Sequence, residues 1–316
     1  MSALQFSAGD EVKLRLAQEE LKGRVLESSD KSIILLKLTS GYNIGIPKEN
    51  ILRSRVLRKF KEEKEESILP PSKGLSAIGL VVTGGTIASK LDPRTGGAKP
   101  LTSVAELSQY YPELFSIARV KTIEVPFMIA SESMNSEHWM AIAESIKRML
   151  DDSDIQGVVI THGTDTLHYT AAALSFFLQK LQKPVVLTYA QRSIDRASSD
   201  AHLNLQCAVR MALSDCAEVM IVGHASLNDD FCFALRGTKV RKLHSSRRDA
   251  FKAVNIPPLA KVWPDREEFL SSYNKKGEGS CELDTEFSDR VGLVKFYPGQ
   301  DASILDFYAL KHQGII

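Results

Sequence analysis

The sequence predicts an α/β protein in which a parallel sheet, flanked by helices, follows a small all-β barrel. Four short apolar runs have the length of strands that are buried on both faces, and they lie at residues 78–82, 157–160, 184–187 and 219–222. The chain also has helical periodicity in three longer stretches, at residues 138–150, 169–181 and 201–214. Apolar strands that alternate with amphipathic helices are typical of crossover units in a parallel sheet.

The first 58 residues carry a different pattern. Apolar and polar residues alternate there in short runs divided by turn-forming Gly, Asp, Ser and Asn, at residues 11–16, 23–26, 32–38 and 42–46. This period of two predicts a small antiparallel barrel or curled sheet over residues 1–58. Because the segment has no cluster of catalytic residue types, we interpret it as an accessory domain for docking or spacing.

A linker is predicted at residues 59–75. This segment mixes Lys and Glu and then continues as Ile-Leu-Pro-Pro-Ser-Lys-Gly. Mixed charge followed by Pro-Pro and Gly is typical of a solvated stretch that ends in a stiff, extended one.

The overall composition limits the classes of function. With 40 basic and 39 acidic residues the formal net charge is +1, so any contact with RNA requires a local patch or a partner. No early segment resembles a secretory signal, and the apolar runs are too short to span a bilayer. The four cysteines form no CxxC pair, and His162 and His168 lack ligand spacing. We therefore expect a cytoplasmic protein without a metal.

The first candidate catalytic loop follows the run at 78–82 and reads Thr-Gly-Gly-Thr-Ile-Ala-Ser at residues 83–89. Two glycines let the backbone approach a bound group closely and leave amides free to stabilise an oxyanion. A tight turn between a strand and a loop is an equal alternative for this motif alone.

The second candidate loop follows the run at 157–160 and reads Thr-His-Gly-Thr-Asp-Thr at residues 161–166. Taken alone, a hydroxyl beside a carboxylate at a helix start is more often an N-cap. Two such loops at one edge of a parallel sheet, however, place hydroxyls and a carboxylate in one crevice, where sheets of this kind bind ligands.

A threonine hydroxyl becomes a nucleophile only when a base takes its proton. The candidate bases are lysines in the segment Arg-Gly-Thr-Lys-Val-Arg-Lys that spans residues 236–242. A lysine that is partly desolvated and near other cations loses its proton more readily. The alternative is that this segment is a solvated basic loop or a contact for a partner.

The two loop motifs together resemble the paired signature of the L-asparaginase/glutaminase family, from about residue 76 to the end of the chain. The resemblance implies an N-terminal catalytic lobe at 76–285 and the start of a C-terminal lobe at 286–316. Residues 291–298 are similar to the opening strand of that lobe, a helix-like stretch follows at 302–310, and a new strand starts at 313. We therefore expect an incomplete, truncated C-terminal lobe.

The resemblance also assigns roles to individual residues. Thr86 would be the nucleophile that attacks the side-chain amide carbon, and Thr164 the second catalytic threonine. Asp165 would hold the amino group of the substrate. The catalytic lysine aligns with Lys242, with Lys239 as the alternative.

Two further positions, Ser131 and Glu132, match contacts of the family to the carboxylate and amino group of the substrate.

Within the family, the added N-terminal domain and the segments at 190–200 and 236–251 resemble the glutaminase subunits of archaeal glutamyl-tRNA(Gln) amidotransferases. The resemblance implies hydrolysis of glutamine to glutamate and ammonia, without a cofactor in this component. A partner, the E-type subunit of the same amidotransferase, would use the ammonia with ATP and Mg²⁺ to convert Glu-tRNA(Gln) to Gln-tRNA(Gln). The asparaginase domain would form a homodimer, giving a heterotetramer with the partner.

Two other functions stay open. One is a stand-alone L-asparaginase, which the added N-terminal domain argues against. The other is a non-catalytic scaffold whose threonine loops are only turns and caps, which the presence of two complete motifs argues against.

Overall fold

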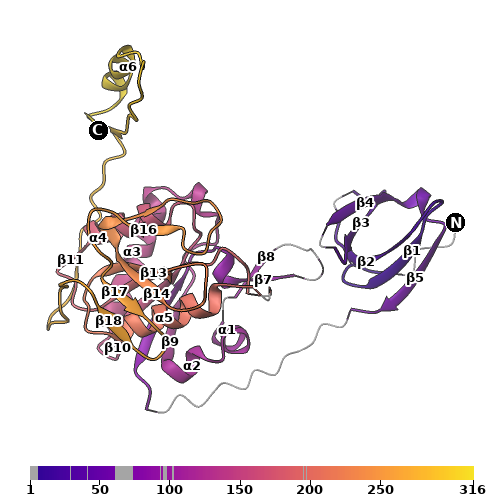
Figure 1. The fold of residues 1–316 in the computed structure, drawn as a ribbon, viewed down its shortest axis with the longest axis horizontal. Helices are drawn as coiled ribbons and strands as arrows, with labels where there is room; N and C mark the ends of the chain where they lie inside the picture. Colours follow the sequence, from indigo (N-terminus) through magenta and orange to yellow (C-terminus); the bar gives the residue numbers. More distant parts are fainter. Residues whose placement is uncertain are drawn as a thin grey trace.

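The computed structural model describes residues 6–28, 30–40, 42–60, 74–92, 94, 98–101, 103–194, 196 and 198–316. The predicted linker at 59–75 therefore lies almost wholly outside the described residues. The described elements form one five-stranded sheet, one eight-stranded sheet and several two-stranded ladders (Figure 1). No helix among the described residues is long and apolar enough to cross a membrane.

The N-terminal sheet is antiparallel, with the strand order β4-β3-β2-β1-β5. Its strands are β1 (Glu11–Arg15), β2 (Glu20–Leu26), β3 (Ile33–Leu38), β4 (Asn43–Pro47) and β5 (Arg53–Arg58), with a 3-10 turn at Lys48–Asn50. Alternate side chains enclose a small core that includes Val12, Leu14, Val25, Leu36 and Ile46. The sheet curls around this core, and β4 and β5 are its edges among the described residues, so it is a curled sheet without a closing ladder.

The large sheet has the strand order β18-β17-β14-β13-β12-β10-β6-β9. Its parallel strands are β6 (Ala77–Val82), β9 (Arg119–Glu124), β10 (Ile155–Thr161), β12 (Val185–Thr188) and β13 (Val219–His224). The other three strands are antiparallel, namely β14 (Cys232–Arg236), β17 (Ala260–Val262) and β18 (Glu267–Phe269). The sheet predicted to be parallel is thus a mixed one. The connection from β13 to β14 is too short for a crossover, so these two strands pair antiparallel.

Helices cover both faces of this sheet, as the sequence predicts. The helices are α1 (Val104–Tyr110), α2 (Leu114–Ile117), α3 (Ser136–Leu150), α4 (Leu167–Phe177) and α5 (Ala201–Leu213). Helices α3 and α4 pack in one core cluster, which contains Ile146 of α3, Leu174 of α4 and Val158 of β10. Helices α1, α2 and α5 pack in the cluster on the opposite face, where Leu205 lies with Leu80.

The remaining elements are small. They comprise the ladders β7 (Ser89–Leu91) with β8 (Ala98–Pro100), β11 (Leu178–Gln179) with β19 (Glu282–Leu283), and β15 (Val240–Lys242) with β16 (Phe251–Ala253). In the last described residues, β20 (Val291–Gly292) pairs in parallel with β21 (Gly314–Ile315). The connection between these two strands contains α6 (Ser303–Lys311). The strand expected at 291–298 is limited to two residues, and α6 contains no buried residue.

Candidate active site

The glycine-rich loop after β6 has a backbone that requires glycine. Gly84 and Gly85 have φ angles of 127° and 81°, in the left-handed region that side chains disfavour. A Cβ atom on Gly85 would lie 2.6 Å from the backbone nitrogen of Gly163, and one on Gly84 would lie 2.5 Å from the carbonyl oxygen of Ile129. The two glycines therefore let this loop touch the threonine loop after β10, and the half-buried Thr86 opens the 3-10 turn that follows.

The threonine loop after β10 is joined to the glycine-rich loop by its backbone. The hydroxyl of Thr83 donates to the carbonyl oxygen of Thr161 at 3.0 Å, because β6 and β10 are neighbours and end at the same sheet edge. The loop leads directly into α4 at Leu167. Both predicted loops thus share one edge of the sheet.

Lys242 reaches this edge from β15. Its Nζ donates to Oγ1 of Thr164 at 2.9 Å and to Oδ1 of Asp165 at 2.8 Å. The Lys242 side chain is 9% exposed, whereas the side chain of Asp165 is 61% exposed. Lys239, the alternative lysine, is exposed on the preceding 3-10 turn. Of the two lysines, Lys242 is therefore the one whose amine contacts the hydroxyl of Thr164.

Ser131 connects the threonine loop to a third segment. It is buried, its Oγ accepts the backbone N–H of Asp165 at 3.2 Å, and its carbonyl oxygen accepts the hydroxyl of Thr166 at 2.6 Å. In the structure Ser131 thus positions the Asp165 backbone. Glu132, the next residue, is exposed.

Thr86 is near this group but not bonded to it. In the part of the chain that the structure describes, its hydroxyl makes no hydrogen bond to Thr164, Asp165 or Lys242. The contact between the Gly85 and Gly163 backbones brings the two loops together at this position. A substrate between them would meet hydroxyls from both.

His162 supports the threonine loop from inside the protein. Its ring is fully buried, and burial lowers its pKa to about 4, so the ring is neutral at pH 7. Its Nδ1 lies 2.7 Å from the carbonyl oxygen of Gly163, and its Nε2 lies 2.9 Å from Oγ1 of Thr170. A neutral ring satisfies both contacts when Nδ1 donates to Gly163 and Thr170 donates to Nε2.

The pKa of His162 predicts acid sensitivity. Histidine in the unfolded chain binds a proton near pH 6.5, whereas buried His162 binds one only near pH 4. The free energy of unfolding therefore falls as the pH drops from 6.5 to 4, by roughly 3 kcal/mol. We expect His162→Asn, measured by urea unfolding at pH 7.5 and 4, to lose correspondingly less stability on acidification than the parent chain. Equal losses in the two proteins would contradict this assignment.

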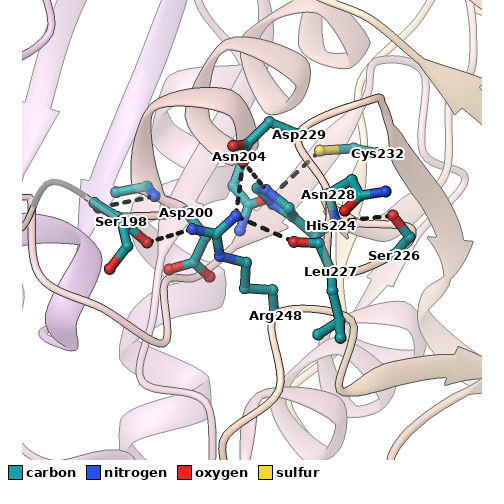
Figure 2. Close-up of polar contacts among 12 residues, drawn as sticks. Ser198, Asp200, Asn204, His224, Ser226, Leu227, Asn228, Asp229, Cys232 and Arg248 are labelled. Atoms are coloured by element: carbon teal, nitrogen blue, oxygen red, sulfur yellow. Dashed lines mark hydrogen bonds and ion pairs between the residues drawn. The ribbon is translucent and has the colours of Figure 1, made fainter.

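A polar network lies at the end of β13, and its contacts are drawn in Figure 2. His224 is buried, with Nδ1 2.6 Å from Oδ1 of Asn204 and Nε2 2.8 Å from Oδ1 of Asp229. The amide nitrogen of Asn204 donates to the carbonyl oxygen of Tyr189, so its oxygen faces the ring. The hydrogen bond from His224 is the main cause that lowers the pKa of Asp229.

Arg248 extends this network to the loop that follows Lys242. Its guanidinium donates to Asp229 at 3.0 Å and to the carbonyl oxygen of Leu227 at 3.2 Å (Figure 2). Its own carbonyl oxygen accepts the hydroxyl of Tyr189. These bonds anchor the connection between β15 and β16, and so the strand that carries Lys242. Sequence analysis missed this network, because only the Arg-rich composition of 236–251 marks it.

Metal ligands are not grouped near this edge. Among the residues that the structure describes, no three His, Cys, Asp or Glu side chains form a group that could hold a metal ion. The four cysteines are buried free thiols.

Comparisons with known proteins identify the family of the chain. The family described as "Asparaginase, N-terminal" matches residues 77–275, and the family described as "GatD N-terminal domain" matches residues 6–57. Among solved structures, a thermostable L-asparaginase from Thermococcus kodakarensis superposes with a TM-score of 0.64 at 29% identity, covering 76% of this chain and 69% of that one. L-asparaginase I from Vibrio cholerae gives 0.61 at 26% identity, covering 74% and 68%.

The chain belongs to the asparaginase family of amidohydrolases. Within it, the chain belongs to the group of D-type subunits of glutamyl-tRNA(Gln) amidotransferase. The D-type subunit from Pyrococcus furiosus is 46% identical, covering 98% of this chain and 74% of that protein. The one from Thermococcus kodakarensis is also 46% identical, covering 98% and 70%.

Proposed function

We propose that the chain is the glutaminase subunit of a glutamyl-tRNA(Gln) amidotransferase, which hydrolyses glutamine to glutamate and ammonia. The observation that carries the proposal is the contact of Lys242 with Thr164 and Asp165, at the sheet edge where the glycine-rich loop presents Thr86. A lysine, two hydroxyls and a carboxylate at one edge supply a nucleophile, a proton acceptor and a group that binds an amino group.

In the proposed reaction, the Thr86 hydroxyl attacks the side-chain amide carbon of glutamine. Loop amides stabilise the resulting oxyanion. The C–N bond then breaks, the leaving nitrogen takes up the proton that the Thr86 hydroxyl has given up and departs as ammonia, and an ester joins the glutamyl group to Thr86. Water, activated through Thr164 and Lys242, attacks this ester, which releases glutamate and restores the Thr86 hydroxyl.

Substrate binding is assigned to the exposed carboxylates and to Ser131. Asp165 is largely exposed and faces Lys242, so its carboxylate can accept the ammonium group of an amino acid. Glu132 is exposed on the segment that begins at Ser131, and we assign it to the same ammonium group. Ser131 is buried, its hydroxyl oxygen accepts the backbone N–H of Asp165, and we assign it to the carboxylate of the substrate.

The proposal also covers partners and location. The glutaminase reaction needs no cofactor, and the E-type subunit would use the ammonia with ATP and Mg²⁺ to convert Glu-tRNA(Gln) to Gln-tRNA(Gln). We propose a homodimer through the asparaginase domain. A cytoplasmic location is supported by the four buried free thiols, which suit a reducing compartment.

A stand-alone L-asparaginase is the second candidate, because the solved structures that resemble the chain are L-asparaginases. The N-terminal domain, which matches a different family over residues 6–57, favours the amidotransferase.

Hydrolysis of glutamine and asparagine by the full chain decides between these functions. Release of ammonia is measured for both substrates, alone and with a candidate E-type partner and tRNA(Gln). We expect a higher kcat/KM for glutamine and stimulation by the partner with tRNA. A preference for asparagine that partner and tRNA leave unchanged would establish the second candidate, and the absence of hydrolysis under every condition would contradict both.

A further inference from the structure

The outer face of the N-terminal sheet is strongly basic. Because side chains alternate along a strand, the register places one set of residues on the face opposite the core. This basic face consists of eight cationic residues and two carboxylates: Lys13, Arg15, Lys22, Arg24, Lys37, Arg53, Arg55, Arg58, Glu11 and Glu20. The core residues of the same strands, such as Val12 and Leu14, point the other way.

Like charges stand directly opposite each other on this face. Arg15 pairs with Arg53, and Lys13 pairs with Arg55 on one side and Lys22 on the other. Arg24 pairs with Lys37 in the next ladder. Directly opposed like charges destabilise a sheet. The same register also sets Glu20 opposite Arg15, and Glu11 opposite Arg24 and Arg58, so four like-charge pairs stand beside three pairs of opposite charge. An anionic partner would remove the repulsion within the four like-charge pairs.

The two carboxylates neutralise only part of the charge. Glu20 pairs with Lys13 at 2.6 Å, and Glu11 pairs with Lys22 at 3.1 Å. Among the described residues, no ion pair engages the six remaining cations of the face. The whole chain carries a net charge of only +1, so this face is a local concentration of positive charge.

The side-chain chemistry of the face fits phosphate groups. Its cations include five arginines, which bind phosphate through two parallel hydrogen bonds. The face has no aromatic side chain on which a base could stack. Contacts of this kind follow the backbone of a nucleic acid without reading its bases.

We propose that the basic face binds the phosphate backbone of an RNA, and that the N-terminal domain is an RNA-docking module. The choice of RNA rests on the proposed function, in which tRNA is the second substrate of the complex. The contact would be independent of base sequence and strongly dependent on salt.

The test uses the full chain and a fluorescent tRNA(Gln) transcript, with binding followed by anisotropy over a range of salt concentrations. We expect Arg53→Gln/Arg55→Gln to weaken binding at least about fivefold at 0.1 M salt and to flatten the log–log salt slope by about 1.5. The melting temperature of this variant should equal or exceed that of the parent chain, because the variant lacks two pairs of directly opposed like charges.

A matched control removes the same charge elsewhere in the domain. Lys31→Gln/Lys48→Gln changes two exposed lysines outside the basic face and should alter affinity less than twofold. Equal weakening by both double variants would overturn the proposal, and so would a parent chain that binds anionic lipid vesicles but not tRNA. Glutamine hydrolysis without RNA is measured in parallel. A chain that binds tRNA but does not hydrolyse glutamine would contradict the proposed function, whereas one that hydrolyses glutamine but does not bind tRNA would contradict only the RNA-docking proposal.

Discussion

Replacement of Thr86 by alanine is expected to lower kcat for glutamine hydrolysis by roughly a thousandfold or more. The hydroxyl is the proposed nucleophile, and its loss removes the covalent route entirely, whereas a binding contact would contribute far less. Thr86 is half-buried on a 3-10 turn, and its side chain belongs to no described hydrogen bond, so its removal should leave the fold intact. Ammonia release at saturating glutamine measures the effect.

Two controls accompany this variant. Thr86→Ser retains a hydroxyl and should keep measurable turnover together with covalent labelling by an amide-mimicking diazo-ketone, which the alanine variant should lose. Thermal unfolding should show the same midpoint for all three proteins. Near-normal turnover in a folded Thr86→Ala protein would assign the nucleophile to another residue.

The buried strands of the large sheet were predictable because burial on both faces leaves a simple mark in the sequence. Strands β6, β10, β12 and β13 each have an almost wholly buried pattern, and each matches a predicted apolar run. The two loops after β6 and β10 were predictable for the same reason, since the strand ends locate them.

The short antiparallel strands of the large sheet, β17 and β18, did not show this apolar pattern in the sequence. Strands β17 and β18 have three residues each, and β18 is only partly buried, with two glutamates in its three positions.

Strand β5 of the N-terminal sheet was also not predicted. It contains three arginines and no fully buried residue, so it lacked the alternation that predicted its neighbours. Periodicity cannot identify strands as short or as polar as these.

The choice between Lys239 and Lys242 required the backbone as well as the sequence. Both lysines lie in one basic segment, and the composition of that segment does not distinguish a catalytic lysine from a solvated one. In the structure, Lys239 is exposed at the end of a 3-10 turn, while Lys242 ends a strand whose pairing with β16 directs it to the threonine loop. The network of Asn204, His224, Asp229 and Arg248 that anchors this loop joins residues from three separate segments, which no local pattern reveals.

Replacement of Lys242 by methionine is expected to lower kcat about a hundredfold or more, since the proposed proton acceptor for Thr164 is lost. Methionine keeps an unbranched apolar side chain that is only one atom shorter than lysine, which matters because Lys242 is only 9% exposed. The change also leaves Asp165 without its 2.8 Å partner, and an unpaired carboxylate should still bind the ammonium group of glutamine. We therefore expect a large effect on kcat and a small one on KM.

The matched control is Lys239→Met, three residues earlier on the same basic segment. It removes the same charge from an exposed position, so kcat should stay within about twofold of the parent value, as for most surface substitutions. If Lys239→Met lost activity and Lys242→Met retained it, the lysine contact with Thr164 would be structural, and proton transfer would have to pass through the other lysine.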